Sequence, residues 1–193
     1  RWLGHKAVDV GKGQLHGLDL QMLRIDPVHR QGRHIELVQD AQRNQRGEIL
    51  RKAFELIMRD AERLAKLITV ENGKALPDSR GEVAYAAEFF RWNAEEAVRN
   101  LGQMSTAPSS GARILVQHKP AGIAVLVTPW NFPAAMATRK IGPALAAGCP
   151  VVLKPASDTP LTMLALMPIL EEAGVPAGVV NVIPSRSSGK VVG

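Results

Sequence analysis

Apolar residues recur every three or four positions in two consecutive stretches of the chain, the first of which begins near Arg46. The first stripe, which stops before Asn72-Gly73, consists of Leu50, Phe54, Ile57, Ala61, Leu64 and Ile68. The second stripe consists of Val83, Ala86, Ala87, Phe90, Ala94 and Ala97. Because this spacing gathers side chains on one face of a helix, we predict two amphipathic helices within residues 46–100 that pack against each other.

Polar and aromatic residues add detail to these helices. Three glutamates precede a basic residue by four positions, which predicts the ion pairs Glu48–Lys52, Glu55–Arg59 and Glu62–Lys66. Asn72-Gly73 favours a helix C-terminus, and the spacing of Ser79 and Glu82 predicts a capping box at the start of the second helix. We expect four aromatic side chains to pack in the core or in a groove: Tyr85, Phe89, Phe90 and Trp92.

The pattern changes after residue 100. Residues 101–111 are rich in Ser, Gly and Pro and predict a loop, whereas residues 113–119 alternate weakly as a strand. Three short apolar runs then follow at intervals of about 28 residues, at positions 122–127, 151–153 and 179–183. Their uninterrupted apolarity is typical of parallel strands that are buried on both faces.

Helix-length segments separate these apolar runs. They are residues 133–147, ending at Gly148, and residues 160–173, with Thr159 as N-cap and Gly174 at the end. The resulting order is β-α-β-α-β over residues 121–183, with right-handed crossovers expected. The predicted fold class is therefore α/β, with an N-terminal helical region that leads into a doubly wound, Rossmann-like, truncated nucleotide-binding sheet.

Composition and charge narrow the range of functions. The 193 residues carry a net charge of +6, but basic and acidic residues are interspersed and aromatic residues make up only 4%, which argues against nucleic-acid binding. No apolar run approaches the roughly 20 residues that span a bilayer, so we expect no membrane association. The single cysteine, Cys149, fits a reducing, cytoplasmic setting.

Residues 1–45 show no sustained apolar period. We leave this segment unassigned, with an aberrant or disordered stretch as one interpretation. Its histidines lack the paired short spacing and the cysteine partners of a zinc site; they are His5, His16, His29 and His34. We therefore assign no metal ligand.

Polar or conformationally restrained segments follow the first two predicted strands, where ligands bind in doubly wound sheets. They are Thr128-Pro129-Trp130-Asn131-Phe132-Pro133 and Lys154-Pro155-Ala156-Ser157. Prolines restrain the backbone around Asn131, whose amide could stabilise an oxyanion or merely cap the following helix. Lys154 could bind ribose hydroxyls or a phosphate, or be a surface lysine without a ligand. No glycine-rich phosphate motif is present, so the residue pattern alone indicates an α/β, nucleotide-binding protein.

Three motifs in the same order closely resemble the aldehyde dehydrogenase superfamily. They are residues 119–125 continuing through Thr128-Pro129-Trp130-Asn131-Phe132-Pro133, residues 148–156 and residues 178–183. Ser157 and residues 184–189 are most similar to the succinate-semialdehyde dehydrogenase branch. The resemblance covers about residues 46–193, which we assign to a partial cofactor-binding domain.

The resemblance implies oxidation of an aldehyde, with succinate semialdehyde the expected substrate, to its carboxylic acid with NAD(P)+. In the family, a cysteine thiolate attacks the aldehyde, a hydride passes to the cofactor and the thioester is hydrolysed. Asn131 would hydrogen-bond the aldehyde oxygen as it becomes an oxyanion. Thr128, Pro129 and Trp130 would line the nicotinamide-ribose and pyrophosphate side of the cofactor.

The second segment would bind the other end of the cofactor. By the resemblance, Lys154 holds the adenosine ribose in a pocket shaped by Pro155 and Ala156. NAD-preferring family members often have a glutamate at the position of Ser157, which grips the ribose 2'-hydroxyl and repels a 2'-phosphate. Serine near a lysine leaves room for that phosphate, so NADP is favoured over NAD.

The sequence ends at Gly193, before the positions at which the family carries its Gly-Ser turn, its Glu-Leu-Gly-Gly base and its catalytic cysteine. We therefore expect the isolated chain to be inactive, and the full-length enzyme to be a homo-oligomer. Cys149 lies far ahead of the family's nucleophile, and we expect it to have a packing role. Two alternatives stay open: a non-catalytic nucleotide-binding or interaction fragment, and a semialdehyde dehydrogenase with another substrate.

Overall fold

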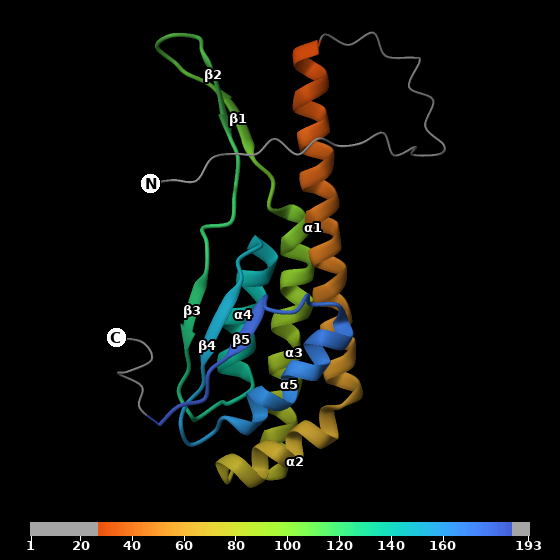
Figure 1. The fold of residues 1–193 in the computed structure, drawn as a ribbon, viewed down its shortest axis with the longest axis vertical. Coiled ribbons are helices and arrows are strands. Elements are labelled where there is room, and N and C mark those ends of the chain that lie inside the picture. The colour runs from red at the N-terminus through yellow and green to blue at the C-terminus, as the bar shows by residue number, and fades with distance from the viewer. Residues whose placement is uncertain (1–26, 187–193) are drawn as a thin grey trace. The chain divides into compact units, whose positions relative to one another are not determined.

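The computed structural model describes residues 27–186, with side chains from residue 42 onward. The chain divides into two compact units, residues 1–37 and 38–193, and the fold below is that of the second unit. Within the described residues, no helix combines the length and the apolarity needed to cross a membrane. Figure 1 shows three helices, a hairpin and a parallel sheet with its connecting helices along the chain.

The helical region consists of α1 (Pro27–Arg59), α2 (Ala61–Asn72) and α3 (Leu76–Arg99). The first predicted helix therefore begins earlier than Arg46 and is interrupted at Asp60. At this interruption, Asp60 occupies the N-cap position of α2, which Asp favours, although its carboxylate accepts hydrogen bonds from the Arg59 and Arg63 side chains instead of a backbone N–H. Gly73 ends α2 in the left-handed conformation, with φ of 78° and its N–H bonded to the Thr69 carbonyl, as predicted.

Both predicted apolar stripes form the core between the helices. Their buried members are Leu50, Ile57, Leu64, Ile68, Val83, Ala86, Ala87, Phe90, Ala94 and Ala97, while Phe54 and Ala61 are half-buried against them. The prediction for the aromatic side chains is wrong in part. Phe90 is buried, Phe89 is half-buried, and the partly exposed Tyr85 packs edge-on against Phe89 and lines a surface groove, as predicted. Trp92 is exposed, because its position on α3 lies outside the apolar stripe.

The predicted capping box and two of the three predicted ion pairs are also wrong. The capping box does not form, since α3 begins at Leu76, three residues before Ser79, and the Ser79 hydroxyl instead lies 2.9 Å from the Thr69 hydroxyl. Of the predicted ion pairs, Glu62–Lys66 is present at 3.9 Å. Glu48 and Glu55 both contact Arg51, and Arg59 pairs with Glu172 and Asp60.

An antiparallel hairpin of β1 (Gln103–Thr106) and β2 (Arg113–Val116) follows α3. The sequence predicted β2 but not β1, which lies within the segment expected to be a loop. All eight residues of the two strands are exposed, so no buried face imposes the apolar alternation by which strands are found. Figure 1 shows the hairpin extending beyond the parallel sheet.

The parallel sheet has the order β3-β4-β5 and confirms the predicted β-α-β-α-β arrangement. Its strands are β3 (Ala124–Val127), β4 (Val151–Lys154) and β5 (Val180–Val182), connected by α4 (Ala135–Ala147) and α5 (Leu161–Ala173). Both helices end at the predicted glycines, Gly148 and Gly174, which have φ of 85° and 102°. That left-handed conformation favours glycine, which has no Cβ to clash.

Burial on both faces, predicted for all three strands, applies only to β4. In β3 the residues alternate, so that Val125 and Val127 are exposed and Ala124 and Leu126 half-buried, and Asn181 is exposed in β5. Helix α4 packs against β3 and β4, and α5 against β5. The described part of the chain therefore leaves one apolar face of β3 uncovered.

Candidate functional site

The two candidate segments lie side by side at the carboxyl edge of the sheet. Val127 is opposite Lys154 in the β3–β4 register, so the residues that follow them begin neighbouring loops. The Thr128 N–H donates a hydrogen bond of 3.3 Å to the Lys154 carbonyl, which extends the pairing by one residue. Thr128 and Pro155 are buried at this edge, whereas Pro129, Trp130 and Asn131 are exposed beyond it.

The turn after β3 is held by side chains from the helical region and from the loop after β4. The Trp130 carbonyl accepts hydrogen bonds from the Asn72 amide at 2.9 Å and from the Thr159 hydroxyl at 3.4 Å. The Asn131 carbonyl accepts one from the Lys74 ammonium at 3.1 Å. Two successive carbonyls of the turn are thus fixed, which orients the backbone that carries the Asn131 side chain.

The side chain of Asn131 does not cap the following helix. The N-cap of α4 is Ala134, whose own side chain makes no cap hydrogen bond. Among the described residues, none forms a hydrogen bond with the Asn131 carboxamide, which leaves its N–H groups available to a ligand. Of the two alternatives left by the sequence, the capping role is therefore wrong.

A buried carboxylate, Glu82, performs that capping role from a distance of 52 residues in the sequence. Its Oε1 accepts hydrogen bonds from the backbone N–H groups of Ala134 at 2.9 Å and Ala135 at 3.3 Å. Its other oxygen forms an ion pair with Lys74, whose ammonium also lies 3.8 Å from the centroid of the Phe132 ring. Glu82 is only 3% exposed, so the carboxylate, the lysine and the turn form one closely packed network.

One feature of the sequence indicates this network. Glu82 adjoins Val83 on the apolar face of α3, where a charged residue is rarely tolerated without partners. The Ser79–Glu82 spacing instead predicted a role for Glu82 at the start of its own helix. Its position on the buried face is the feature that indicates a partner in another element.

Helix α5 is capped in the same way by Glu71 at the end of α2. Its carboxylate accepts hydrogen bonds of 2.7 Å from the N–H groups of Leu161 and Thr162, and one of 2.6 Å from the Thr162 hydroxyl. The predicted N-cap, Thr159, is wrong: Pro160 occupies that position, and the Thr159 hydroxyl bonds the Trp130 carbonyl instead. Thr159 therefore belongs to the candidate site.

Lys154 and Ser157 occupy the loop after β4. Lys154 is only 4% exposed, which excludes the alternative of an ordinary surface lysine, and none of the described carboxylates pairs with it. The Ser157 hydroxyl donates a hydrogen bond of 3.0 Å to the Ser185 carbonyl, which follows β5. The site thus presents a buried amine, without a carboxylate partner, at the carboxyl end of β4, a donor that suits ribose hydroxyls or a phosphate.

Comparison with known sequences decides the family. A profile described as "Aldehyde dehydrogenase family" matches residues 32–193. The chain belongs to the aldehyde dehydrogenase family. The match begins within α1, ahead of Arg46, at which the resemblance was first visible in the sequence.

Several similar proteins are succinate-semialdehyde dehydrogenases. That of Paenarthrobacter nicotinovorans is 55% identical over 148 residues, which are 77% of this chain and 33% of that protein. Succinate-semialdehyde dehydrogenase (NADP(+)) 1 of Schizosaccharomyces pombe is 52% identical over 143 residues, which are 74% of this chain and 29% of that protein. The chain thus spans about a third of the length of these relatives.

Solved structures agree with the α/β fold class. An NADP dependent enzyme of E. coli matches with a TM-score of 0.71 and 50% identity, over 73% of this chain and 29% of that one. The succinate-semialdehyde dehydrogenase of Burkholderia pseudomallei matches with a TM-score of 0.71 and 45% identity, over 80% of this chain and 34% of that one. The parallel sheet with connecting helices is therefore the Rossmann-like arrangement of the aldehyde dehydrogenase family.

Cys149 lies at the opposite edge of the sheet from these segments. It precedes β4, whereas Lys154 ends that strand, and its side chain is buried. In this aldehyde dehydrogenase chain it is therefore separated from Asn131 by the length of β4. Among the described residues there is also no group of three or more His, Cys, Asp or Glu side chains that could hold a metal ion.

Proposed function

We propose that this chain supplies the oxyanion donor and part of the NAD(P)+ pocket of an aldehyde dehydrogenase that oxidises succinate semialdehyde. The observation that carries the proposal is the placement of Asn131 and Lys154. Their loops start as neighbours through the Thr128–Lys154 hydrogen bond, and both side chains lack a described protein partner. Unpaired polar groups on adjacent loops at the carboxyl ends of parallel strands are suited to the two ends of an extended ligand.

Each residue has a defined task in this proposal. The Asn131 carboxamide donates a hydrogen bond to the aldehyde oxygen as negative charge develops on it, from a turn that Lys74 and Asn72 hold in place. Thr128, Pro129 and Trp130 line the nicotinamide side of the pocket. When bound, NAD(P)+ accepts the hydride from the substrate carbon.

At the other end of the pocket, the Lys154 ammonium donates hydrogen bonds to the ribose hydroxyls, between Pro155 and Ala156. We propose that NADP+ is the preferred cofactor, because Ser157 offers no carboxylate to repel a 2'-phosphate. The names of the Schizosaccharomyces pombe relative and of the E. coli structure, both of which mention NADP, support this choice. The hydroxyl of Ser157 donates to the Ser185 carbonyl, so the donors left for a phosphate are the backbone N–H of Ser157 and the Lys154 ammonium.

The reaction also needs a thiolate and a general base, and we assign neither to residues 42–186. Cys149, the single cysteine of the sequence, is at the wrong edge of the sheet. We therefore expect the 193-residue polypeptide to show no turnover of succinate semialdehyde or propanal with either cofactor. A second candidate function, a nucleotide-binding fragment without catalysis, rests on this same separation of Cys149 from Asn131.

The test of the catalytic proposal uses a full-length enzyme. Residues 38–186 would replace the matching segment of the Paenarthrobacter nicotinovorans succinate-semialdehyde dehydrogenase, and Asn131→Ala would be compared with the unchanged chimera. We expect kcat to fall by about 10²–10³ while the Kd for NADP+ stays the same, as for removal of an oxyanion donor. A full-rate Asn131→Ala enzyme would contradict the proposed role.

The expectations for partners and location follow from the same proposal. The partner is a small-molecule aldehyde, the intact enzyme is a homo-oligomer and its setting is cytoplasmic. The exposed apolar face of β3, with Val125 and Val127, is consistent with a further covering element or subunit. Sedimentation of the chimera would test the oligomeric state.

A further inference from the structure

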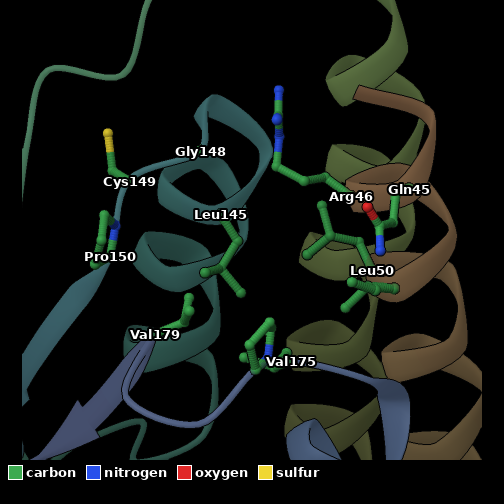
Figure 2. A pocket seen from close by; sticks show the side chains of 11 residues that line it. Gln45, Arg46, Leu50, Leu145, Gly148, Cys149, Pro150, Val175 and Val179 are labelled. Carbon is green, nitrogen blue, oxygen red and sulfur yellow. The ribbon is translucent and has the colours of Figure 1, made fainter. Parts of the chain in front are cut away.

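A partly open cavity lies at the amino ends of the parallel strands, at the opposite end of β4 from the proposed cofactor site. It has a volume of about 250 Å³ and is bordered by α1, the end of α4 and the turn between α5 and β5. Its walls are mostly apolar and include Ile49, Leu50, Leu145, Pro150, Val175 and Val179. Figure 2 shows Leu50 and Leu145 facing this space, with Val175 and Val179 below them.

One charged side chain, Arg46, stands at the border of the apolar cavity. Figure 2 shows it reaching from α1 toward the end of α4, where its Nε donates a hydrogen bond of 3.1 Å to the Ala146 carbonyl. That bond satisfies a carbonyl at the C-terminus of α4 and uses only the Nε of the guanidinium. No carboxylate pairs with Arg46 among the described residues, so its two terminal amino groups remain available.

Arg46 also borders a second, more polar cleft of about 480 Å³. The basic residues that line this cleft are Arg43, Arg46, His118 and Lys119, and its described lining includes neither Asp nor Glu. Burial lowers the pKa of the Arg46 guanidinium; Arg43 adds to this shift and Cys149 opposes it. A bound anion would offset the desolvation of Arg46.

The apolar cavity and the basic cleft meet at one guanidinium, which defines the shape of a ligand. We infer that this edge of the sheet binds an amphipathic organic anion, a carboxylate with a short alkyl chain. The carboxylate contacts the terminal amino groups of Arg46 at the border of the basic cleft, and the alkyl chain fills the space between Leu50 and Leu145. Charge complementarity selects the head group, and the mostly aliphatic lining of the cavity selects the tail.

The inference is tested first with a ligand series on the unchanged 193-residue chain. Butanoate, hexanoate and octanoate would be titrated calorimetrically, with hexanol, hexylammonium and succinate as comparisons. Each buried methylene should tighten binding by about fourfold until the cavity is full. Hexanol and hexylammonium should bind at least tenfold more weakly than hexanoate, roughly the value of a charge-assisted hydrogen bond. Succinate should also bind weakly, because its second carboxylate would enter the apolar space.

Cys149 provides an independent readout, since it lines the apolar cavity and is the single cysteine of the sequence. Hexanoate should slow alkylation of its thiol by iodoacetamide, whereas succinate at the same concentration should not. Equal protection by both anions, or affinity that does not change with chain length, would overturn the inference. Neither experiment requires a variant that must fold.

Two variants then separate the head-group and tail contributions. Arg46→Gln should weaken hexanoate binding by about tenfold or more and abolish its advantage over hexanol. Val179→Phe should fill part of the cavity and remove the dependence on chain length while the preference for an anion persists. Arg91→Gln is the matched control, because Arg91 is an exposed arginine on α3 that pairs with Glu88. Loss of binding in this control, or full binding in Arg46→Gln, would refute the assignment.

Discussion

The N-termini of α4 and α5 are both capped by a carboxylate that is distant in the sequence, but the two carboxylates differ in burial and in partners. Each N-terminus binds a carboxylate from the helical region, Glu82 for α4 and Glu71 for α5. Glu82 is buried and also paired with Lys74, which reaches the Asn131 turn, whereas Glu71 is half-buried and serves α5 alone among the contacts described. The helical region thus anchors both crossovers of the sheet, and at α4 the anchoring carboxylate is linked through Lys74 to the Asn131 turn.

Replacing Glu82 should have the largest effect. In Glu82→Gln the amide oxygen can still accept from the Ala134 N–H, but Lys74 loses its partner and keeps a mostly buried charge. We expect the free energy of unfolding to fall by about 3 kcal/mol or more, the usual result of breaking a buried pair. Urea unfolding followed by circular dichroism measures it. Glu88→Gln on the same helix is the control, and equal losses in the two variants would refute the distinction.

Replacing Glu71 should have a smaller effect. Glu71→Ala removes a cap from α5 but leaves no buried ammonium behind, and the Leu161 end of the helix is exposed to water. The loss should be about 1–2 kcal/mol, as for other N-caps. The same unfolding experiment applies. A loss as large as that of Glu82→Gln would show that capping alone, rather than the ion pair, dominates at both helices.

The exposed pair between Arg59 and Glu172 should have the smallest effect. Hydrogen bonds from the Arg59 guanidinium, at 2.6 and 2.9 Å, hold the pKa of the Glu172 carboxyl below its ordinary value. A lowered folded-state pKa stabilises the fold above the unfolded pKa, and this contribution disappears as the pH falls through the folded value. Arg59→Gln should therefore raise the pKa of Glu172, which an NMR titration measures. The free energy of unfolding at neutral pH should barely change. An unchanged pKa would mean that the pair is absent in solution.

The sequence predicted those features that depend on neighbours along the chain. The apolar stripes at Leu50 to Ile68 and Val83 to Ala97, the three parallel strands and the glycines that end α4 and α5 all follow from local spacing. Strand β1 was missed because none of its residues is buried, and the break at Asp60 because the apolar stripe continues across it.

In the candidate site, too, the sequence predicted the segments defined by local pattern and missed the contacts between distant residues. The segments at 128–133 and 154–157 were found because they directly follow predicted strands, and the structure makes them neighbours. Glu82, Glu71 and Lys74 were not assigned to it, since each contacts the site or its helices from 52 to 91 positions away. Local patterns carry no information about which distant carboxylate reaches a helix N-terminus.

The most direct test of the proposed pocket is the ratio of the Kd values for NAD+ and NADP+, measured calorimetrically on the 193-residue chain. We expect the unchanged chain to bind NADP+ about tenfold more tightly than NAD+, since an anionic phosphate near Lys154 gains a charge-assisted contact. Ser157→Glu should reverse this preference by repelling the phosphate. Ser157→Ala, which loses only the hydrogen bond to the Ser185 carbonyl, should retain it. If Ser157→Glu leaves the ratio where it was, the loop after β4 does not hold the adenosine ribose and the account of this site is wrong.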